Sequence, residues 1–400
     1  MIYTRIEDKK GLTMEAAKAA FMEGLAKLGK RERVLLIPPD ITRIHGLGGM
    51  LAVWATEFYG NAVKQILPAL GTHVPMTPKE IEVMYPGVDP SLFTVHDWRH
   101  DIVTLGTVPK EFIEEVSEGK LSYEWKAQVN KALVHGGFDL ILSLGQVVPH
   151  EVIGMANYNK NVFVGTGGAD GINKSHYLGA VYGMERIMGR TDSPVRAVLD
   201  YAEKHFAQEL PLVYALTVVG RNDHGEMKPM GLFVGDDRSC YEEAAALSLE
   251  VNFTMVPEPL EKVVVYLDPE EFRTTWLGNK SIYRTRMAIA DNGELIVLAP
   301  AVAGFGEDEE IDRLIRKYGY KGTPKVLSDV EKHKDLKDNL SAAAHLIHGS
   351  SEGRFTIRYC PGKLTKEEIE QVGYEWGDLQ QMLQRYPIES LKDGWNTDAQ

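Results

Sequence analysis

Residues 138–144, FDLILSL, decide the fold class, because this apolar run ends at a glycine and is followed by polar, glycine-rich sequence. A short apolar run bounded by turn residues predicts a buried β-strand. The same order occurs earlier, where the amphipathic segment 14–28 precedes the apolar run 33–37 and two prolines. Helices that alternate with buried strands predict an α/β fold with a largely parallel sheet. Because ligands bind beyond the carboxyl ends of such strands, polar residues just after each strand are the candidate functional residues.

A second domain is predicted beyond a change of composition at residues 254–261, TMVPEPLE, which holds two prolines and two acidic residues. We therefore expect two α/β domains, 1–258 and 259–400, with largely parallel sheets and the active site in the cleft between them. The last helix is free to pack back on the first domain. Periodicity predicts these further elements: helices at 125–134, 279–290 and 307–318, and strands at 262–267 and 294–299.

Composition excludes several classes of protein. The 44 Lys and Arg against 57 Asp and Glu give a net charge of −13, which opposes binding to nucleic acid or to anionic membranes. The two cysteines, Cys240 and Cys360, are too few for a disulfide framework and indicate a reducing compartment. The N-terminus lacks the apolar core of a signal peptide, and no apolar run approaches the roughly 20 residues of a membrane helix. We expect a cytoplasmic protein.

The first polar segment is Asp40-Ile41-Thr42-Arg43, directly after the strand at 33–37. An arginine held by an aspartate is a preorganised clamp for a carboxylate, since the guanidinium matches two oxygens at once. The alternative is a helix N-cap, with Asp40 or Thr42 accepting a backbone N–H.

The second segment places His73 in a loop before Thr77 and Glu80. Thr77 and Glu80 have the spacing of a capping box, so they are predicted to begin a helix. His73 is either a solvated loop residue or an acid/base group.

The third segment, 145–176, is the densest. It holds six glycines, two histidines and two lysines, namely His150, His176, Lys160 and Lys174. Glycines allow a backbone to approach a ligand closely, and exposed N–H groups suit a phosphate. No Walker or G-x-G-x-x-G pattern is present, so a standard nucleotide loop is excluded. A plain mobile loop is the alternative.

A fourth segment in the second domain is cationic although the chain is acidic. Lys280 and Arg284 share one helical face, and Arg286 follows. An anion site is one interpretation, and a solvated helix face is the other. His96 and His100 have the i,i+4 spacing of a zinc pair, without a recognisable third ligand.

Together, D-x-T-R, G-T-H-x-P-M-T-x-x-E and the ordered series His150, Lys160 and His176 resemble the lactate racemase family. The intervals of 10 and 16 residues within that series are the specific feature. The resemblance implies the family's cofactor, a nickel-pincer nucleotide, which is pyridinium-3,5-bisthiocarboxylic acid mononucleotide with nickel. It also implies that cofactor-biosynthesis enzymes are partners.

The resemblance assigns roles to individual residues. Arg43 would hold the substrate carboxylate and Asp40 would orient it, while His73 and His150 would be paired acid/base groups. Lys160 would attach the cofactor, and His176 would ligate nickel. Further contacts with the cofactor are expected from Thr42, Gly167, Gly168 and Lys174. Lys174 is also an alternative attachment site, because residues 155–159, MANYN, replace the family's usual Ser-Gly-Gly stretch.

The implied reaction is inversion at C2 of a 2-hydroxy acid, by hydride transfer to the cofactor while a histidine removes the hydroxyl proton. Neutral imidazoles are required, so activity is expected to fall as pH drops through about 6.5. The substrate-binding residues expected from the second domain are Trp276, Asn279, Lys280, Tyr283 and Arg284. These favour a longer polar acid, with gluconate 2-epimerisation the leading interpretation and lactate or malate racemisation an alternative. A zinc-dependent hydrolase or lyase and a non-catalytic sugar-acid-binding protein are further alternatives.

Overall fold

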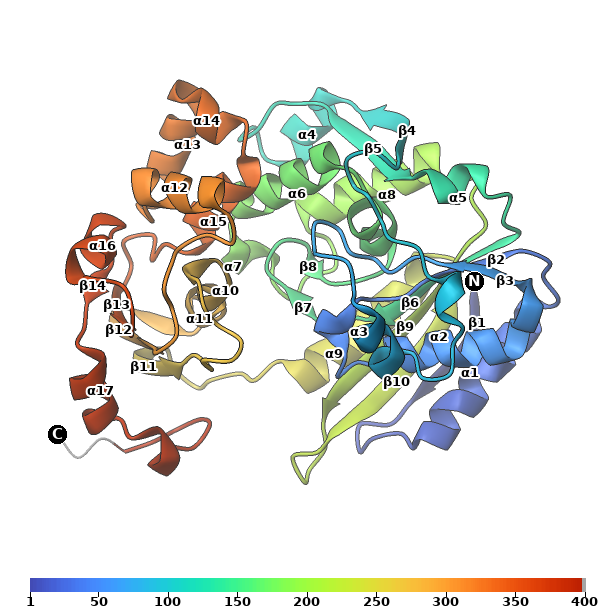
Figure 1. The fold of residues 1–400 in the computed structure, drawn as a ribbon, viewed down its shortest axis with the longest axis horizontal. Helices are drawn as coiled ribbons and strands as arrows, with labels where there is room; N and C mark the ends of the chain where they lie inside the picture. The colour runs from blue at the N-terminus through green and yellow to red at the C-terminus, as the bar shows by residue number, and fades with distance from the viewer. Residues whose placement is uncertain (398–400) are drawn as a thin grey trace. The chain divides into compact units, whose positions relative to one another are not determined.

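The computed structural model describes residues 1–397 and divides the chain into two compact units. Unit 1 comprises Met1–Tyr182 and Arg186–Thr254. Unit 2 comprises Gly183–Glu185 and the chain from Met255 onward. The domain limits expected from the sequence, 1–258 and 259–400, remain a prediction. The elements of both units are labelled in Figure 1.

Unit 1 is built on a six-stranded sheet in the order β1-β10-β9-β6-β2-β3. The neighbours β9, β6, β2 and β3 are parallel, while β1 and β10 add an antiparallel edge. The strands are β1 (Ile2–Glu7), β2 (Val34–Ile37), β3 (Val63–Ile66), β6 (Leu140–Gln146), β9 (Leu212–Arg221) and β10 (Met227–Gly235). Two small antiparallel pairs accompany it, β4 (Ile102–Val108) with β5 (Trp125–Asn130), and β7 (Pro149–His150) with β8 (Gly154–Met155).

Helices cover both faces of this sheet. On one face α1 and α2 join a core with alternate residues of β2, β6 and β9, including Leu36, Leu142 and Ala215. Side chains alternate across a strand, so Tyr214 lies on the other face, where its hydroxyl reaches Glu203 of α8. The helices are α1 (Met14–Leu28), α2 (Gly48–Tyr59), α3 (Pro78–Met84), α4 (Lys110–Val116), α5 (Lys131–His135), α6 (Ala169–Tyr182), α7 (Met184–Ile187), α8 (Pro194–Phe206) and α9 (Arg238–Asn252).

Unit 2 contains a four-stranded parallel sheet in the order β11-β12-β13-β14. Its strands are β11 (Leu260–Tyr266), β12 (Ile289–Ala299), β13 (Thr356–Pro361) and β14 (Glu375–Trp376). Its last helix packs its apolar side chains, such as Met382 and Leu383, onto Ile296 and Cys360 of this sheet. The helices are α10 (Thr275–Gly278), α11 (Lys280–Thr285), α12 (Glu309–Tyr318), α13 (Thr323–Lys332), α14 (Lys334–Lys337), α15 (Leu340–His348), α16 (Lys366–Gln371) and α17 (Leu379–Arg385).

The predicted α/β class with largely parallel sheets is confirmed, but two predicted helices are wrong in part. Residues 125–134 form β5 followed by the short α5, because Trp125, Ala127 and Val129 alternate inward when β5 pairs with β4. The helix expected at 279–290 ends at Thr285, and β12 already begins at Ile289. Asn292, with φ of 64°, lies within β12 at an irregularity of the strand register.

Cys240 and Cys360 are both free and buried. Within residues 1–397, none of the helices is long and apolar enough to cross a membrane.

Candidate active site

The predicted site residues of unit 1 gather at one edge of its sheet. β2 pairs in parallel with both β3 and β6, so the carboxyl ends of these three strands lie side by side. Asp40 follows β2, His73 follows β3 and His150 follows β6. The topology therefore brings together three segments that are far apart in the sequence, at the edge where parallel sheets bind ligands.

Asp40 connects the first two segments. The carboxylate is buried, with 5% of the residue exposed. Its Oδ1 accepts the backbone N–H of Thr42 at 3.2 Å, which caps the 3₁₀ turn Ile41–Arg43. Its Oδ2 lies 2.6 Å from Nδ1 of His73. Burial raises the pKa of Asp40, but the bonds from His73 and Thr42 outweigh it, so the pKa is lowered and the carboxylate stays ionised.

The expected Asp40–Arg43 clamp is wrong in its pairing. The two carboxylate oxygens of Asp40 serve Thr42 and His73, and the Arg43 guanidinium donates to the Thr42 carbonyl at 3.3 Å. Arg43 is exposed, and its charge contributes to the lowered pKa values of His150 and Lys160. Its cation therefore acts on the site and is available for a ligand oxygen.

His150 lies on the short strand β7, with 13% of its side chain exposed. Nδ1 accepts the backbone N–H of Val152 at 3.1 Å. Burial lowers the pKa of His150 to about 3, the Glu151 carboxylate opposes this shift, and the charges of Lys160 and His176 add to it. The imidazole is therefore neutral at physiological pH, with its proton on Nε2.

Lys160 precedes a π-helical turn at Asn161–Gly165. Burial, and then the charge of Arg43, lower the pKa of its amine to about 8. A lysine in this state presents a substantial fraction of neutral, nucleophilic amine near neutral pH. This is the chemistry that covalent attachment of a cofactor requires.

His176 lies on α6, and its Nδ1 donates to the carbonyl of Ile172 at 2.7 Å, one helical turn earlier. This bond leaves the lone pair on Nε2, which is the arrangement typical of metal-ligating histidines. Burial lowers the pKa of His176, so the ring is in the neutral form that a metal needs.

The glycine-rich loop is tied to the His73 loop. The N–H of Gly71 donates to the carbonyl of Gly165 at 2.8 Å. A Cβ on Gly167 would lie 1.9 Å from the Phe163 carbonyl oxygen, and a Cβ on Gly168 would lie 2.3 Å from Oε1 of Gln128. These glycines are therefore required for packing against protein atoms, and their contact with a cofactor remains a prediction.

The ammonium group of Lys174 is bonded to other groups of the protein. Its ammonium donates to the carbonyl of Glu124 at 2.7 Å and pairs with Asp170 at 2.7 Å, one turn away on α6. Both bonds would have to break before Lys174 could reach another group. The structure therefore favours Lys160 over Lys174 as the attachment site.

His96 does not form the zinc pair considered from the sequence. It is buried, its Nε2 donates to the carbonyl of Gly167 at 2.9 Å, and its Nδ1 accepts from the Asn130 amide at 3.0 Å. His100 is exposed and bonds Asp97. Within residues 1–397, no three His, Cys, Asp or Glu side chains form a group able to hold a metal ion by themselves. The ring of His96 instead supports the glycine-rich loop.

In unit 2, the predicted substrate-binding residues lie on α10 and α11. Trp276 is partly buried and packs on His345, with ring centroids 4.4 Å apart. Asn279 is fully buried and donates to the hydroxyl of Tyr374 at 3.0 Å, which favours a structural role over the expected substrate contact. Tyr283 is also buried, whereas Lys280 is partly exposed and Arg284 is exposed.

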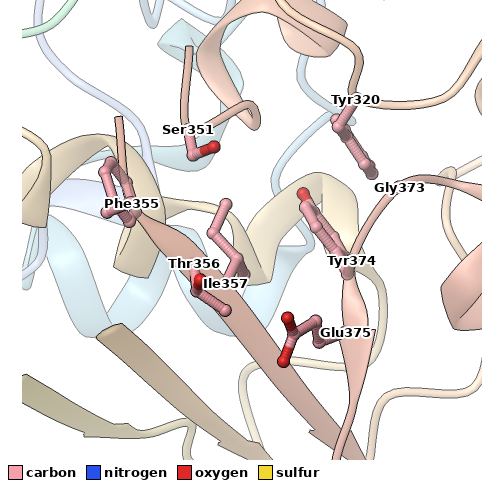
Figure 2. A pocket seen from close by; sticks show the side chains of 8 residues that line it. All are labelled: Tyr320, Ser351, Phe355, Thr356, Ile357, Gly373, Tyr374 and Glu375. Atoms are coloured by element: carbon pink, nitrogen blue, oxygen red, sulfur yellow. The ribbon is translucent and has the colours of Figure 1, made fainter. Parts of the chain in front are cut away.

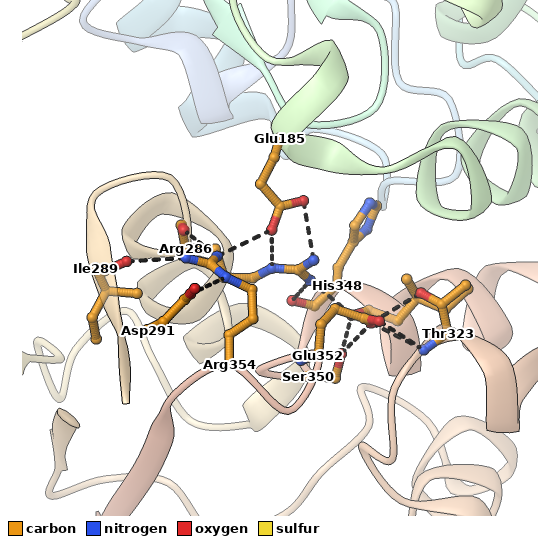
Figure 3. Close-up of polar contacts among 10 residues, drawn as sticks. Glu185, Arg286, Ile289, Asp291, Thr323, His348, Ser350, Glu352 and Arg354 are labelled. Carbon is orange, nitrogen blue, oxygen red and sulfur yellow. Dashed lines mark hydrogen bonds and ion pairs between the residues drawn. The ribbon is translucent and has the colours of Figure 1, made fainter. Parts of the chain in front are cut away.

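Arg286, grouped with these cations in the sequence, is a structural residue of unit 2. Only 3% of it is exposed, and it binds the Glu185 carboxylate through Nε at 2.8 Å and a terminal nitrogen at 3.1 Å (Figure 3). The same guanidinium donates to the carbonyl of Ile347 at 3.0 Å. Its charge is therefore used inside unit 2 and is not part of a ligand site.

A pocket of about 200 Å³ lies elsewhere in unit 2. It is lined by Tyr320, Phe355, Tyr374 and Glu375 among others (Figure 2). The rings of Tyr320 and Tyr374 stack with centroids 4.7 Å apart. The pocket contains none of the predicted site residues, and its wall is part of the packing of this unit.

Two residues that contribute to the site were missed. Glu151 places a carboxylate 3.7 Å from Nδ1 of His150, and adjacency to His150 was its only sequence signal. Arg196 on α8 is fully buried beneath the segment that carries Lys160. The sequence feature that could have pointed to Arg196 is the spacing of an arginine, an aspartate and a glutamate at positions 196, 200 and 203 of one amphipathic helix.

Residues 17–187 match the family model of the lactate racemase N-terminal domain. This range includes Asp40, Arg43, His73, His150, Lys160 and His176. Residues 17–187 are therefore similar to that domain, and the match covers less than half of the chain. The resemblance seen in the sequence is thereby confirmed, and it supports a racemase-type isomerase activity for the chain. A search of curated proteins finds no match.

Two solved structures share the fold. A Thermotoga maritima protein is 25% identical with a TM-score of 0.78, over 94% of each chain. The lactate racemase apoprotein from Thermoanaerobacterium thermosaccharolyticum is 18% identical with a TM-score of 0.68, over 90% of this chain and 83% of that one. The lactate racemase fold thus extends beyond the matched N-terminal residues.

Proposed function

We propose that this protein inverts C2 of a 2-hydroxy acid with a nickel-pincer nucleotide and two histidine acid/base groups. The observation that carries the proposal is the gathering of Asp40, His73 and His150 at one edge of the sheet, electrostatically coupled to Lys160 and His176. The match of residues 17–187 to the lactate racemase N-terminal domain supports the racemase type, and the geometry of these side chains supports the division of roles.

The two catalytic histidines differ in which nitrogen carries the proton. The Asp40 carboxylate accepts from Nδ1 of His73, so the neutral ring has its lone pair on Nε2 and acts as a base. The Val152 N–H occupies Nδ1 of His150, so that neutral ring carries its proton on Nε2 and acts as an acid. His73 would take the hydroxyl proton from one enantiomer. The product of that step is a planar 2-keto acid. When its other face is turned toward the hydride donor, His150 would supply a proton to its C2 oxygen.

The charges of unit 1 suit an anionic substrate in spite of the net charge of −13. Arg43 is exposed beside the Asp40–His73 pair and can hold a carboxylate through two donors. We therefore assign the substrate carboxylate to Arg43.

The residues present fit the cofactor. His176 offers Nε2 to nickel, and Lys160 offers an amine for attachment through the thiocarboxyl group. A single histidine ligand is sufficient for a metal whose other donors belong to the nucleotide. When bound, the cofactor would supply a hydride acceptor for the C2 hydrogen.

For the substrate, we propose a longer polar acid such as gluconate. Within unit 2, Lys280 and Arg284 of α11 and the partly exposed Trp276 of α10 present charge, hydrogen-bonding groups and an aromatic face, and their contact with the substrate stays a prediction. Lactate and malate are the shorter alternatives in the same reaction class. A substrate panel distinguishes them.

The test is to co-produce the protein with the cofactor-making enzymes, then measure nickel, the mass of the peptide containing Lys160, and C2 inversion of gluconate, malate and lactate. We expect about one nickel per chain, an adduct on Lys160 and inversion of at least one acid. Protein without nickel, adduct and inversion would contradict the proposal. Zinc at full occupancy that depends on His100 would favour the hydrolase alternative, and tight binding without turnover would favour a binding protein.

A further inference from the structure

Helix α8 carries a polar face turned into unit 1. Arg196, Asp200 and Glu203 follow each other at i, i+4 and i+7, so they lie on the same side of the helix. Arg196 is fully buried, and the Asp200 side chain is 26% exposed. A buried charge is costly unless it is paired and hydrogen-bonded. The hydrogen-bond partners of these three side chains therefore indicate the structural role of this helix face.

All three side chains meet at Asn159, the residue before Lys160. The Asn159 amide nitrogen donates to Oδ1 of Asp200 at 2.7 Å and to Oε2 of Glu203 at 2.9 Å. Its carbonyl oxygen accepts from the Arg196 guanidinium. A reversed amide would place its oxygen against two carboxylates, so only one orientation satisfies the network. The side chain of Asn159, itself fully buried, is thus fixed from three directions.

Asp200 and Glu203 each accept a further hydrogen bond from outside this cluster. The second oxygen of Asp200 accepts from Arg238 of α9, and the second oxygen of Glu203 accepts from the Tyr214 hydroxyl at 2.6 Å. Each carboxylate oxygen of Asp200 and Glu203 therefore has a donor. Within the same cluster, Nε of Arg196 is buried without a hydrogen-bond partner among residues 1–397. A buried network with so many of its polar groups paired is rigid and favours one geometry.

Arg196 also holds the backbone that leads to Lys160. One terminal nitrogen donates to the carbonyls of Met155 at 2.8 Å and Asn157 at 3.2 Å. Asn157 and Tyr158 have φ values of 65° and 58°, a region that is unfavourable for residues with a Cβ. Two such residues in succession need support from their surroundings. Arg196 supplies it, together with the Tyr241 ring stacked on Tyr158 at 5.2 Å.

We propose that Asn159 and Arg196 are positioning residues that fix the strained turn at 157–158 and thereby set where the Lys160 amine lies. The importance of that amine for catalysis rests on the proposed function, whereas the positioning does not. The structural test therefore uses protein without cofactor. The failure of one proposal can then be told from the failure of the other.

The experiment measures the rate at which trinitrobenzenesulfonate modifies Lys160, by peptide mass spectrometry between pH 6 and 10. Asn159→Leu removes all three bonds, and Arg196→Lys keeps the charge but loses the planar fork. We expect each to change the Lys160 rate at pH 8 at least threefold or to move its pH midpoint. Adding Asn157→Gly to Asn159→Leu should restore part of the rate, because glycine adopts positive φ without strain.

Ser117→Ala is the matched control. Ser117 is 1% exposed and bonds only within its own loop, to Leu121 and Glu114, among the described residues. It should lower the thermal midpoint without altering Lys160. An unchanged Lys160 profile in folded Asn159→Leu and Arg196→Lys would overturn the positioning. A changed profile in these variants, with no nickel, adduct or inversion in the co-produced wild-type protein, would uphold the positioning and overturn only the proposed function.

Discussion

Nδ1 of His73 lies 2.6 Å from Oδ2 of Asp40, and the two residues differ sharply in exposure. The side chain of Asp40 is 6% exposed and that of His73 is 55% exposed. A buried carboxylate that holds one nitrogen of an accessible imidazole fixes its tautomer and directs the other nitrogen outward. This pair is why His73, otherwise an ordinary loop histidine, is assigned as a base.

Asp40→Asn should lower kcat by about 10²–10⁴-fold, because an amide that donates to Nδ1 forces the proton onto Nε2 and removes the base. Nickel content should be unchanged. Ser117→Ala is the comparison, since Ser117 is buried away from these residues and bonds to Leu121 and Glu114, and it should cost less than tenfold. The kcat of each variant is measured by steady-state kinetics on cofactor-loaded protein. Equal losses in both variants would show that the effect is structural and not due to the tautomer.

Substitution of His73, His150 and His176 should have different effects on nickel content and on inversion. His73→Ala and His150→Ala should each abolish inversion while retaining nickel, and His176→Ala should lose the metal, because only His176 is assigned as its ligand. Nickel analysis and inversion assays on the same preparations check this. Inversion that persists in both His73→Ala and His150→Ala would reject the two-base mechanism.

The pH dependence differs from that expected of ordinary imidazoles. Burial lowers the pKa of His150 to about 3, below its unperturbed value near 6.5, so this ring stays neutral down to about pH 4. The loss of activity expected near pH 6.5 therefore does not arise from His150. NMR of histidine-labelled protein, with His150→Gln to assign the signal, should show no titration of His150 between pH 8 and 5. A midpoint between 6 and 7 would contradict the burial argument.

His345 makes the stability of unit 2 depend on pH. Its Nε2 bonds the Tyr320 hydroxyl at 3.0 Å, and burial lowers its pKa to about 3. The unfolded chain then binds a proton that the folded chain does not, so stability falls as pH drops below about 6.5 and continues to fall toward pH 3.

His345→Gln keeps a hydrogen-bonding group for Tyr320 and removes the titration. The difference in unfolding free energy between pH 7 and pH 5, from urea titrations, should be smaller in the variant by up to about 2 kcal/mol. His333→Gln, at a partly exposed position, is the comparison. Equal pH dependence of His345→Gln and the wild type would show that His345 is not the group responsible.

Local pattern was sufficient for the elements that determine the site. The runs at 33–37 and 138–144 are the buried strands β2 and β6, and the capping box of Thr77 and Glu80 begins α3. The helix predicted over 125–134 failed because the sequence WKAQVN pairs with β4, a contact that lies outside any local window.

The site was predictable where its residues follow strands, and not where they act through packing. Position and spacing drew attention to His73, His150, Lys160 and His176, and their roles stay a prediction. The Asp40–Arg43 pairing was wrong, because four-residue proximity does not determine which way a side chain points. Arg196 was missed since its role depends on how α8 packs beneath Asn159, which spacing along the chain does not reveal.

The most direct test of C2 inversion by hydride transfer is the reaction of cofactor-loaded protein in deuterated water. We expect an inverted 2-hydroxy acid that keeps its C2 hydrogen as protium, measured by NMR and mass spectrometry, because that hydrogen never exchanges with solvent. Inverted product carrying about one deuterium at C2 per turnover would contradict it, since it would require proton abstraction from carbon.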